Sequence, residues 1–217
     1  MRVLCLAAHP DDEVLGVGGT LLKHHAAGDQ TRLVVATVAY TPRWSASTVQ
    51  RKREECIKAA GLLGISDVQF LEFKTMHLNA LPAIELNDAV GRTVREFDPH
   101  VLYAPPIDDV NQDHAALFAA LLVAARQTGS TSLRSLYSYE IPPTTRYNAS
   151  NRWQPNSYVD IGEHIDAKLE AMAAYETELR DPPHPRSLES IRAFARARGA
   201  ALGVGYAEAH MLVRELR

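Results

Sequence analysis

Cysteine is scarce in this chain: its 217 residues include only two, Cys5 and Cys56. Cys5 lies in an apolar run typical of a strand, and Cys56 lies in a segment with helical periodicity. Both positions are typical of small core residues in a reducing compartment. We therefore expect neither a disulfide nor a cysteine metal site.

Long apolar runs and one-sided charge are also missing. No stretch approaches the roughly 18 apolar residues of a membrane span. Met1 and Arg2 lead directly into an apolar run, which leaves no room for a signal peptide. The net charge is −3, with no basic block typical of nucleic-acid binding and no acidic tail. These absences predict a cytoplasmic protein with neither membrane nor nucleic acid as its partner.

The most informative stretch covers residues 3–19. An apolar run, Val3 to Ala8, ends at five residues with the sequence His9-Pro10-Asp11-Asp12-Glu13. A glycine-rich segment with Gly16, Gly18 and Gly19 follows, and we expect a turn there and then a helix over 20–27. A buried strand that runs into a polar loop and then a helix is typical of the first β-α unit of an α/β sheet.

The composition of this loop favours a metal over a phosphate. A phosphate-binding turn offers glycine amides to an anion, whereas three carboxylates would repel one. One imidazole beside carboxylates suits zinc or a similar divalent ion. The alternative is a solvated polar turn. The glycines would also allow the following helix to pack closely on the sheet.

Strands and helices alternate along the next hundred residues. The pattern predicts strands over 31–38, 68–71, 101–104 and 133–139, and helices over 47–63, 84–97 and 114–126. Ser47 or Thr48 is the expected cap of the helix over 47–63. This alternation implies a Rossmann-like three-layer α/β sandwich with a mainly parallel sheet. Loops after residues 8, 38, 71, 104 and 139 should then open at one edge of the sheet, where ligands bind.

The last third of the chain is less regular. Residues 141–157 form a long loop that is a candidate binding or lid segment. A short strand is expected over 158–161, helices over 165–179 and 188–198, and a strand or short helix over 207–216. With no internal repeat or linker, we expect one domain, 1–217, with a carboxyl-terminal elaboration.

The run from Ala8 to Glu13, followed by Gly18-Gly19-Thr20, resembles the signature of the PIG-L/LmbE-like zinc-dependent deacetylases. That family removes acetyl groups from N-acetylglucosamine-type sugars and their conjugates. The resemblance extends over most of the chain. It implies a metal-dependent N-deacetylase with Zn²⁺ or another divalent metal as cofactor. It also implies a small-molecule N-acetyl sugar or conjugate as substrate, and a homo-oligomer, either trimer or hexamer.

A zinc site needs three or more protein ligands, so the first loop alone is insufficient. His114 ends the polar run 109–114 and should lie at the same sheet edge as His9. The resemblance assigns His9, Asp12 and His114 as the metal ligands, which leaves an open position for water. A helix-capping or surface histidine is the alternative interpretation of His114.

The resemblance also assigns catalytic and supporting roles. Asp11 would be the general base, Glu13 would position the loop, and Asp113 would orient a metal ligand from behind. Many members carry a histidine where this chain has Asn111, thought to stabilise the oxyanion. Asparagine donates a hydrogen bond but supplies no positive charge. Either Asn111 takes this role or another histidine does; His184 is the candidate, against a simple loop-packing role.

Five residues are candidates for substrate binding: Arg51, Lys74, Arg146, Trp153 and Arg186. Arg51 fits an Arg-x-x-Glu pattern of the family, with Arg53 as a rival and a solvated helix face as the alternative for both. Lys74 would suit an anionic group of the substrate; the alternative is an exposed lysine without a role in binding. Arg146 and Trp153 lie in the long loop with Asn148, Asn151 and Arg152. Prolines beside Arg186 and His184 would hold both side chains in place.

These observations predict a zinc-dependent hydrolase that releases acetate from an N-acetylated amino sugar or its conjugate. Two alternatives stay open. One is a metal-dependent amidase acting on a non-sugar amide. The other is a non-catalytic sugar- or nucleotide-binding α/β module, against which the complete ligand set and Asp11 argue.

Overall fold

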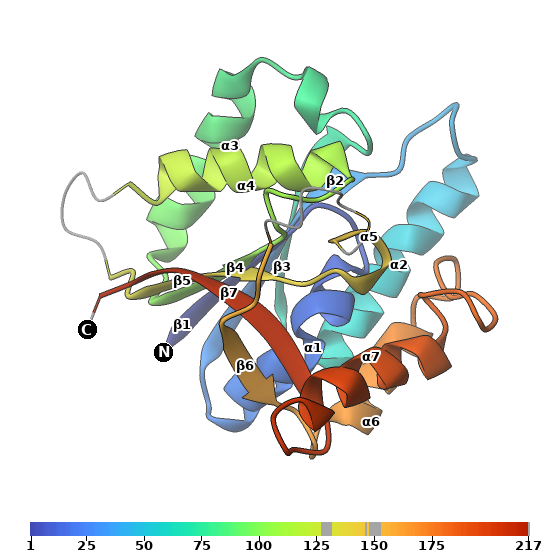
Figure 1. Cartoon of the computed structure of the whole chain (residues 1–217). Coiled ribbons are helices and arrows are strands. Elements are labelled where there is room, and N and C mark those ends of the chain that lie inside the picture. The colour runs from blue at the N-terminus through green and yellow to red at the C-terminus, as the bar shows by residue number, and fades with distance from the viewer. Residues whose placement is uncertain (127–131, 146, 148–152, 217) are drawn as a thin grey trace.

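The computed structural model of the chain describes residues 1–126, 132–145, 147 and 153–216. Its strands are β1 (Arg2–Ala7), β2 (Gln30–Val38), β3 (Asp67–Lys74), β4 (Val101–Ala104), β5 (Ser135–Tyr139), β6 (Ser157–Asp160) and β7 (Ala207–Glu215). They form one sheet in the order β3-β2-β1-β4-β5-β7-β6 (Figure 1). The first five strands run parallel, and β7 pairs antiparallel with both β5 and β6.

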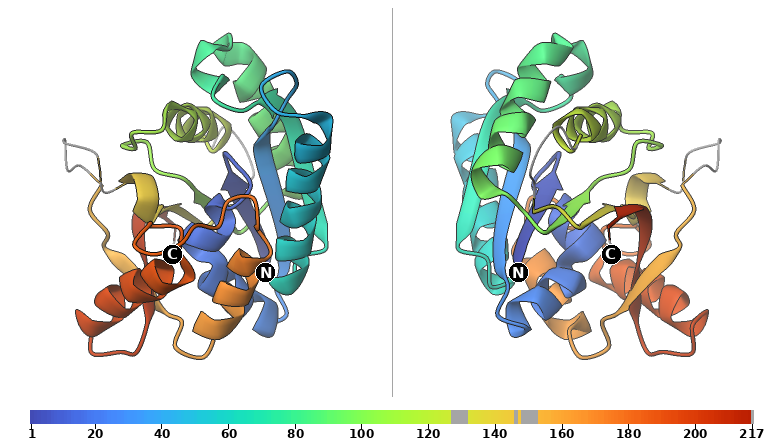
Figure 2. Two further views of the ribbon diagram at one scale, coloured as in Figure 1. Left: turned by 90° about the vertical axis from the view of Figure 1, so that its right-hand side faces the viewer. Right: turned by 90° about the vertical axis from the view of Figure 1, so that its left-hand side faces the viewer.

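The helices form two layers on this sheet (Figure 2). They are α1 (Asp12–Ala26), α2 (Ala46–Leu62), the 3₁₀ turn η1 (Leu78–Ala80), α3 (Ala83–Phe97), α4 (Gln112–Ala124), α5 (Pro142–Thr145), α6 (Ile165–Ala173) and α7 (Leu188–Ala200). One buried cluster joins the sheet to α1, α2, α6 and α7, and the other joins it to α3 and α4. The three-layer α/β sandwich with a mainly parallel sheet is therefore confirmed.

The first strand shows why the chain begins with an uninterrupted apolar run. Val3, Cys5 and Ala7 pack into one cluster, whereas Leu4 and Leu6 pack into the other. Because successive side chains of a strand point to opposite faces, a strand covered on both sides must be apolar throughout. Both cysteines are buried and unpaired, as expected of core residues.

The prediction of a turn at Gly16, Gly18 and Gly19 is wrong, because α1 begins at Asp12 and contains all three glycines. The expected close packing on the sheet is confirmed. A Cβ atom at Gly16 would lie 2.2 Å from the ring of Tyr139, and one at Gly19 would lie 2.6 Å from Ile161. Glycine at these positions thus allows α1 to pack closely against its neighbours, and this gain outweighs the low helix propensity of glycine.

Several element boundaries also differ from expectation. Ser45, not Ser47 or Thr48, caps α2, and its hydroxyl accepts a hydrogen bond from Thr48 N at 3.1 Å. β3 extends to Lys74, and the loop over 141–157 contains the short helix α5. Of the segment 207–216, residues Ala207–Glu215 form the strand β7, which pairs with both β5 and β6.

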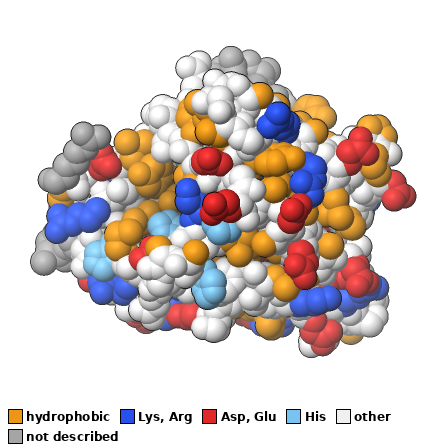
Figure 3. Space-filling model, turned by 90° about the horizontal axis from the view of Figure 1, so that it is seen from below, with side chains coloured by type: hydrophobic (Ala, Val, Ile, Leu, Met, Phe, Trp, Pro, Cys, Tyr) orange, Lys and Arg blue, Asp and Glu red, His pale blue; other side chains and the backbone are white. Residues whose placement is uncertain are grey.

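The surface agrees with the balanced composition. On the face drawn in Figure 3, acidic and basic side chains are interspersed with apolar ones. Among the described residues, none of the helices combines the length and apolarity that a membrane span requires.

A buried ion pair ties α1 to the carboxyl-terminal elements. Glu208 on β7 accepts hydrogen bonds from Gly19 N and Thr20 N, both at 2.8 Å, and from Lys168 Nζ at 2.6 Å. Lys168 on α6 also donates to Leu15 O at 3.0 Å. Both charged side chains are almost fully buried. This network holds in place the helix whose first turn carries the motif residues.

Replacing Glu208 with Gln should lower the free energy of unfolding by about 3–5 kcal/mol, because Lys168 would stay buried without a counter-charge. Chemical denaturation measures this loss. Glu170→Gln, at an exposed position on the same helix as Lys168, is the matched control. A loss below about 1 kcal/mol would contradict the importance of the pair.

The same contacts predict how the stability lost in Glu208→Gln depends on pH. Burial by itself would raise the pKa of Glu208, but Lys168 and the hydrogen bonds outweigh burial and lower it below the usual 4.5. The folded state then binds this proton less tightly than the unfolded state. The contribution of Glu208 is therefore present above about pH 4.5 and disappears as the pH falls through the lowered pKa. The stability difference between the wild type and Glu208→Gln should shrink over that range.

Candidate functional site

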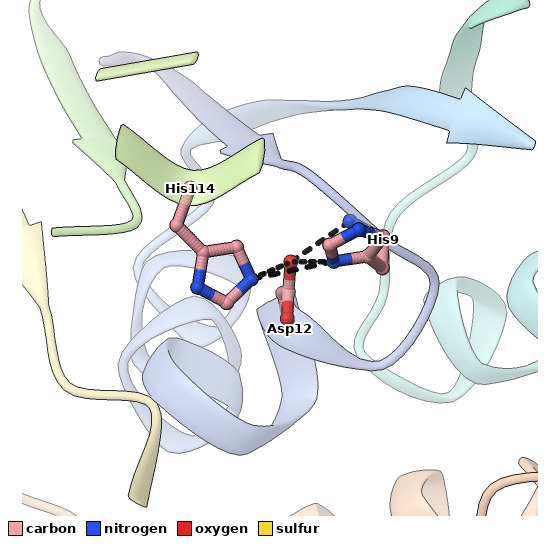
Figure 4. A group of neighbouring side chains, drawn as sticks. All are labelled: His9, Asp12 and His114. Atoms are coloured by element: carbon pink, nitrogen blue, oxygen red, sulfur yellow. Dashed lines mark hydrogen bonds and ion pairs between the residues drawn. The ribbon is translucent and has the colours of Figure 1, made fainter. Parts of the chain in front are cut away.

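Three predicted ligand side chains converge at the carboxyl ends of β1 and β4. His9 follows β1, Asp12 lies in the first turn of α1, and His114 lies in the first turn of α4. His9 Nδ1 is 3.3 Å from His114 Nε2 and 3.5 Å from Asp12 Oδ2, and His114 Nε2 is 3.4 Å from Asp12 Oδ2 (Figure 4). The two loops meet because β1 and β4 are neighbouring parallel strands.

These distances fit a single divalent ion. In a tetrahedral site with zinc–ligand bonds of about 2.0–2.1 Å, neighbouring ligand atoms lie about 3.3–3.4 Å apart. The three candidate ligand atoms lie 3.3–3.5 Å from one another. Among the described residues, this is also the group of histidine and carboxylate side chains whose ligand atoms could hold a metal ion. Two imidazoles with one carboxylate are a donor set typical of catalytic zinc.

The local backbone explains the position of His9 and Asp12. The oxygen of Ala8 accepts hydrogen bonds from Thr37 N at 3.0 Å and Thr37 Oγ1 at 2.7 Å, which holds the end of β1. His9 N donates to Asp12 Oδ2 at 2.8 Å, so the carboxylate folds back over the turn. A carboxylate in the first turn of a helix is also stabilised by the helix dipole.

Each imidazole has a second carboxylate on its other nitrogen. Asp113 Oδ2 is 2.9 Å from His9 Nε2, and Asp109 Oδ2 is 3.3 Å from His114 Nδ1. Asp113 also accepts hydrogen bonds from Met76 N and Leu78 N at 2.6 and 2.9 Å. Such carboxylates orient an imidazole so that its other nitrogen faces a metal.

The neighbouring carboxylates favour the protonated, positively charged forms of His9 and His114. Burial lowers the pKa of His9, but hydrogen bonds with Asp113 and Asp12 outweigh burial and raise it to about 10. Burial likewise lowers the pKa of His114, and the charge of Asp12 with the contact to Asp109 raises it to about 9. Burial raises the pKa of Asp12, whereas the charge of His114 and the hydrogen bonds of both imidazoles hold it far below its usual range.

Asp11 lies beside the cluster in a rarely populated backbone conformation, with φ at 106°. Such a conformation costs about 1–3 kcal/mol and persists only where surrounding contacts hold it. Asp11 N donates to Glu13 Oε2 at 3.3 Å, and Glu13 Oε1 accepts from Tyr175 Oη at 2.5 Å. Burial raises the pKa of Asp11, Arg186 opposes this, and Asp12 adds to it.

A cavity of about 560 Å³ opens over the cluster. The described residues that line it come from the segments after β1, β2, β3, β4 and β5 and from the carboxyl-terminal loops: His9, Pro10, Asp11, Asp12, Leu15, Ala39, Trp44, Lys52, Thr75, Met76, Asn79, Val110, Asn111, Gln112, Asp113, His114, Ile141, Pro143, Thr144, Glu178 and Arg186. The expectation that these loops open at one edge of the sheet is confirmed.

Arg186 and Asn111 are the further predicted site residues that the fold brings to this cavity. Arg186 Nη1 lies 3.4 Å from Asp11 Oδ2 and also contacts Glu178. Asn111 caps α4, and its Oδ1 accepts a hydrogen bond from Asp113 N at 3.0 Å.

Four predicted site residues are not among the described residues that line this cavity: His184, a candidate acid or oxyanion donor, and the candidate substrate contacts Trp153, Arg51 and Lys74. His184 is exposed, and its Nδ1 accepts a hydrogen bond from Arg186 N at 3.0 Å, so it packs the loop. Trp153 is buried, and its indole donates to Ser138 Oγ at 3.1 Å. Arg146 lies outside the described residues, together with Asn148, Asn151 and Arg152.

Arg51 is not among the described lining residues, and it contacts Glu55 and Glu176, with 54% of its side chain exposed. Lys52, the next residue, lines the cavity instead. Arg53 contacts Glu72 and is not among the lining residues either. Lys74 is exposed, with its Nζ over the ring of Tyr40. Neighbouring helical residues differ by about 100° in direction, so the Arg-x-x-Glu pattern could not select among them.

Sequence reasoning missed four residues at the site: Asp109, Lys52, Tyr175 and Glu178. Asp109 could have been found, because it lies five residues before His114 in the same polar loop. Glu178 contacts both Lys52 and Arg186, and these contacts join α2 to the loop after α6. Nothing local marks this ion cluster, because its members come from distant segments.

Comparison with known proteins adds relatives of known activity. The chain is 25% identical to the 1D-myo-inositol 2-acetamido-2-deoxy-alpha-D-glucopyranoside deacetylase of Mycobacteroides abscessus, covering 82% of this chain and 81% of that protein. It is 24% identical to the diacetylchitobiose deacetylase of Thermococcus kodakarensis, covering 95% and 81%.

The fold is shared with solved structures of the same size. The crystal structure of a conserved protein from Thermus thermophilus superposes with a TM-score of 0.79 at 26% identity, covering 99% of this chain and 96% of that one. A family model described as PIG-L, GlcNAc-PI de-N-acetylase, matches residues 4–125 and so includes the strand, the polar loop and His114. The chain therefore belongs to the PIG-L family of deacetylases.

Proposed function

We propose that the chain is a zinc-dependent N-deacetylase that hydrolyses the acetamido group of an N-acetylated amino sugar or its conjugate. The products are acetate and a free amine. The observation that carries this proposal is the convergence of His9, Asp12 and His114 in the cavity, with the carboxyl of Asp11 beside them. Membership of a deacetylase family and the substrates named for its relatives support the choice of reaction and of sugar.

The proposed ligand atoms are His9 Nδ1, His114 Nε2 and Asp12 Oδ2. A bound zinc ion would polarise the amide carbonyl and lower the pKa of a water molecule. Asp113 and Asp109 keep the two imidazoles turned toward this point. Because His9 is hydrogen-bonded to Asp113 and His114 faces the carboxylate of Asp109, little reorganisation should be needed when an ion binds.

Asp11 is the proposed general base. It would accept a proton from the attacking water and return that proton to the amine as the C–N bond breaks. Its backbone is held by Glu13, and its carboxyl is held by Arg186. Arg186 and Asn111 line the same cavity. Arg186 is the proposed substrate contact, and Asn111 is the proposed hydrogen-bond donor to the oxyanion.

The first test is acetate release from N-acetylglucosamine and its conjugates. We expect turnover that a chelator abolishes and that added Zn²⁺ or another divalent ion restores, with about one metal ion bound per chain. Metal analysis and an acetate assay measure both. Acetate release that a chelator leaves unchanged would contradict the proposed metal dependence, and release only from non-sugar amides would contradict the substrate.

Replacing Asp11 with Asn should lower kcat by about 10²–10⁴-fold, because the side chain could no longer accept a proton. Metal content should stay near that of the wild type, since Asp11 is not a proposed ligand. Asp88→Asn, at an exposed position on α3, is the matched control. Unchanged turnover in Asp11→Asn would exclude it as the base.

Replacing Asp113 with Asn should weaken metal affinity by about 10–100-fold, because the carboxylate that orients His9 would be lost. Competition with a chromogenic chelator measures the affinity. Asp109→Asn should have a similar effect through His114. Wild-type affinity in both variants would contradict the proposed orientation of the imidazoles.

A further inference from the structure

The cationic side chains in the cavity already have anionic partners. Lys52 and Arg186 both contact Glu178, and Arg186 Nη1 is also 3.4 Å from Asp11 Oδ2. These are the lysine and arginine side chains among the described lining residues. An anionic group on a substrate would have to compete with Glu178 and Asp11 for them. The paired charges thus favour a neutral substrate.

Three apolar side chains also line this cavity. Trp44, Met76 and Val110, here called the apolar wall, come from the loops after β2, β3 and β4 and line the same cavity as the metal cluster. Met76 is 59% exposed and Val110 is 49% exposed. Large apolar side chains left in water around a ligand cavity are typical of a binding surface.

Two of the three wall residues, Trp44 and Met76, are held by contacts with neighbouring residues. The Trp44 ring packs edge-on against Tyr40 with ring centroids 5.7 Å apart, and the Arg43 guanidinium lies 5.0 Å from the Trp44 ring. Met76 has φ at 65°, an unfavourable conformation for a residue with a side chain, and its N–H donates to Asp113 Oδ2 at 2.6 Å. The wall is therefore joined directly to the carboxylate that orients His9.

We propose that the apolar wall is a subsite for a neutral apolar group, alkyl or aryl, attached to the amino sugar. The substrate class would then be apolar conjugates, in preference to the free sugar and to anionic conjugates such as sugar phosphates. This inference rests on the proposed deacetylase function for its catalytic readout. Each methylene group that leaves water should add about fourfold to binding.

The test compares three compounds: hexyl 2-acetamido-2-deoxyglucoside, free N-acetylglucosamine and N-acetylglucosamine 1-phosphate. We expect kcat/KM for acetate release from the hexyl glycoside to exceed both others by at least tenfold, mainly through a lower KM. A value for the free sugar or the phosphate that equals or exceeds that of the hexyl glycoside would overturn the subsite.

Substitutions in the apolar wall test whether it causes the preference for the hexyl glycoside. Trp44→Ala should reduce the ratio of kcat/KM between hexyl glycoside and free sugar at least fivefold, whereas Trp44→Phe should retain most of it. Ile84→Ala removes a side chain that is 67% exposed on α3 and lies outside the described lining residues, so it is the matched control. An unchanged ratio in Trp44→Ala would also overturn the subsite.

A binding measurement separates this inference from the proposed function. Calorimetric titration of the wild type with the hexyl glycoside and with free N-acetylglucosamine reports on the wall even without turnover. Tighter binding of the hexyl glycoside with no acetate release would support the subsite and contradict the deacetylase. Equal binding together with acetate release from both would contradict the subsite and leave the deacetylase standing.

Discussion

The parallel pairing of β1 with β4 is the constraint on which the site depends. Val3, Leu4 and Cys5 pair in register with the first residues of β4, so both strands end at the same edge of the sheet. His9 and His114 are separated by 105 positions in sequence, yet their ring nitrogens lie 3.3 Å apart. A shift in this register would move one imidazole away and leave Asp12 with a single neighbour.

Around this pairing, buried polar groups hold the side chains and loops of the site in fixed orientations. Asp113 contacts His9, Met76 N and Leu78 N at once, so the ring of a proposed ligand, the wall of the cavity and the start of η1 are held by one carboxylate. Buried hydrogen bonds of this kind fix the orientation of the groups that they join. The proposed metal ligand His9 and the cavity residue Met76 therefore share one carboxylate, that of Asp113.

The carboxyl-terminal part of the chain supports the site from the other side. Glu208 and Lys168 hold α1, whose first turn contains Asp12, and Tyr175 holds Glu13 beneath Asp11. Helix α1 can lie this close to the sheet because Gly16 and Gly19 have no side chain where Tyr139 and Ile161 pack. The elaboration after β5 is thus part of what positions the motif.

The sequence by itself determined the α/β alternation and the buried first strand, because these depend on local periodicity. It also pointed to the group His9, Asp12 and His114, because the run from Ala8 to Glu13 resembles a family signature whose ligand positions could be carried over. Only the tertiary structure decided which cation of α2 faces the cavity, since the rotation of the helix selects Lys52 over Arg51. It also decided that Trp153 is buried, because packing against distant segments sets burial. Contacts between segments far apart in sequence carry no local pattern from which they could be predicted.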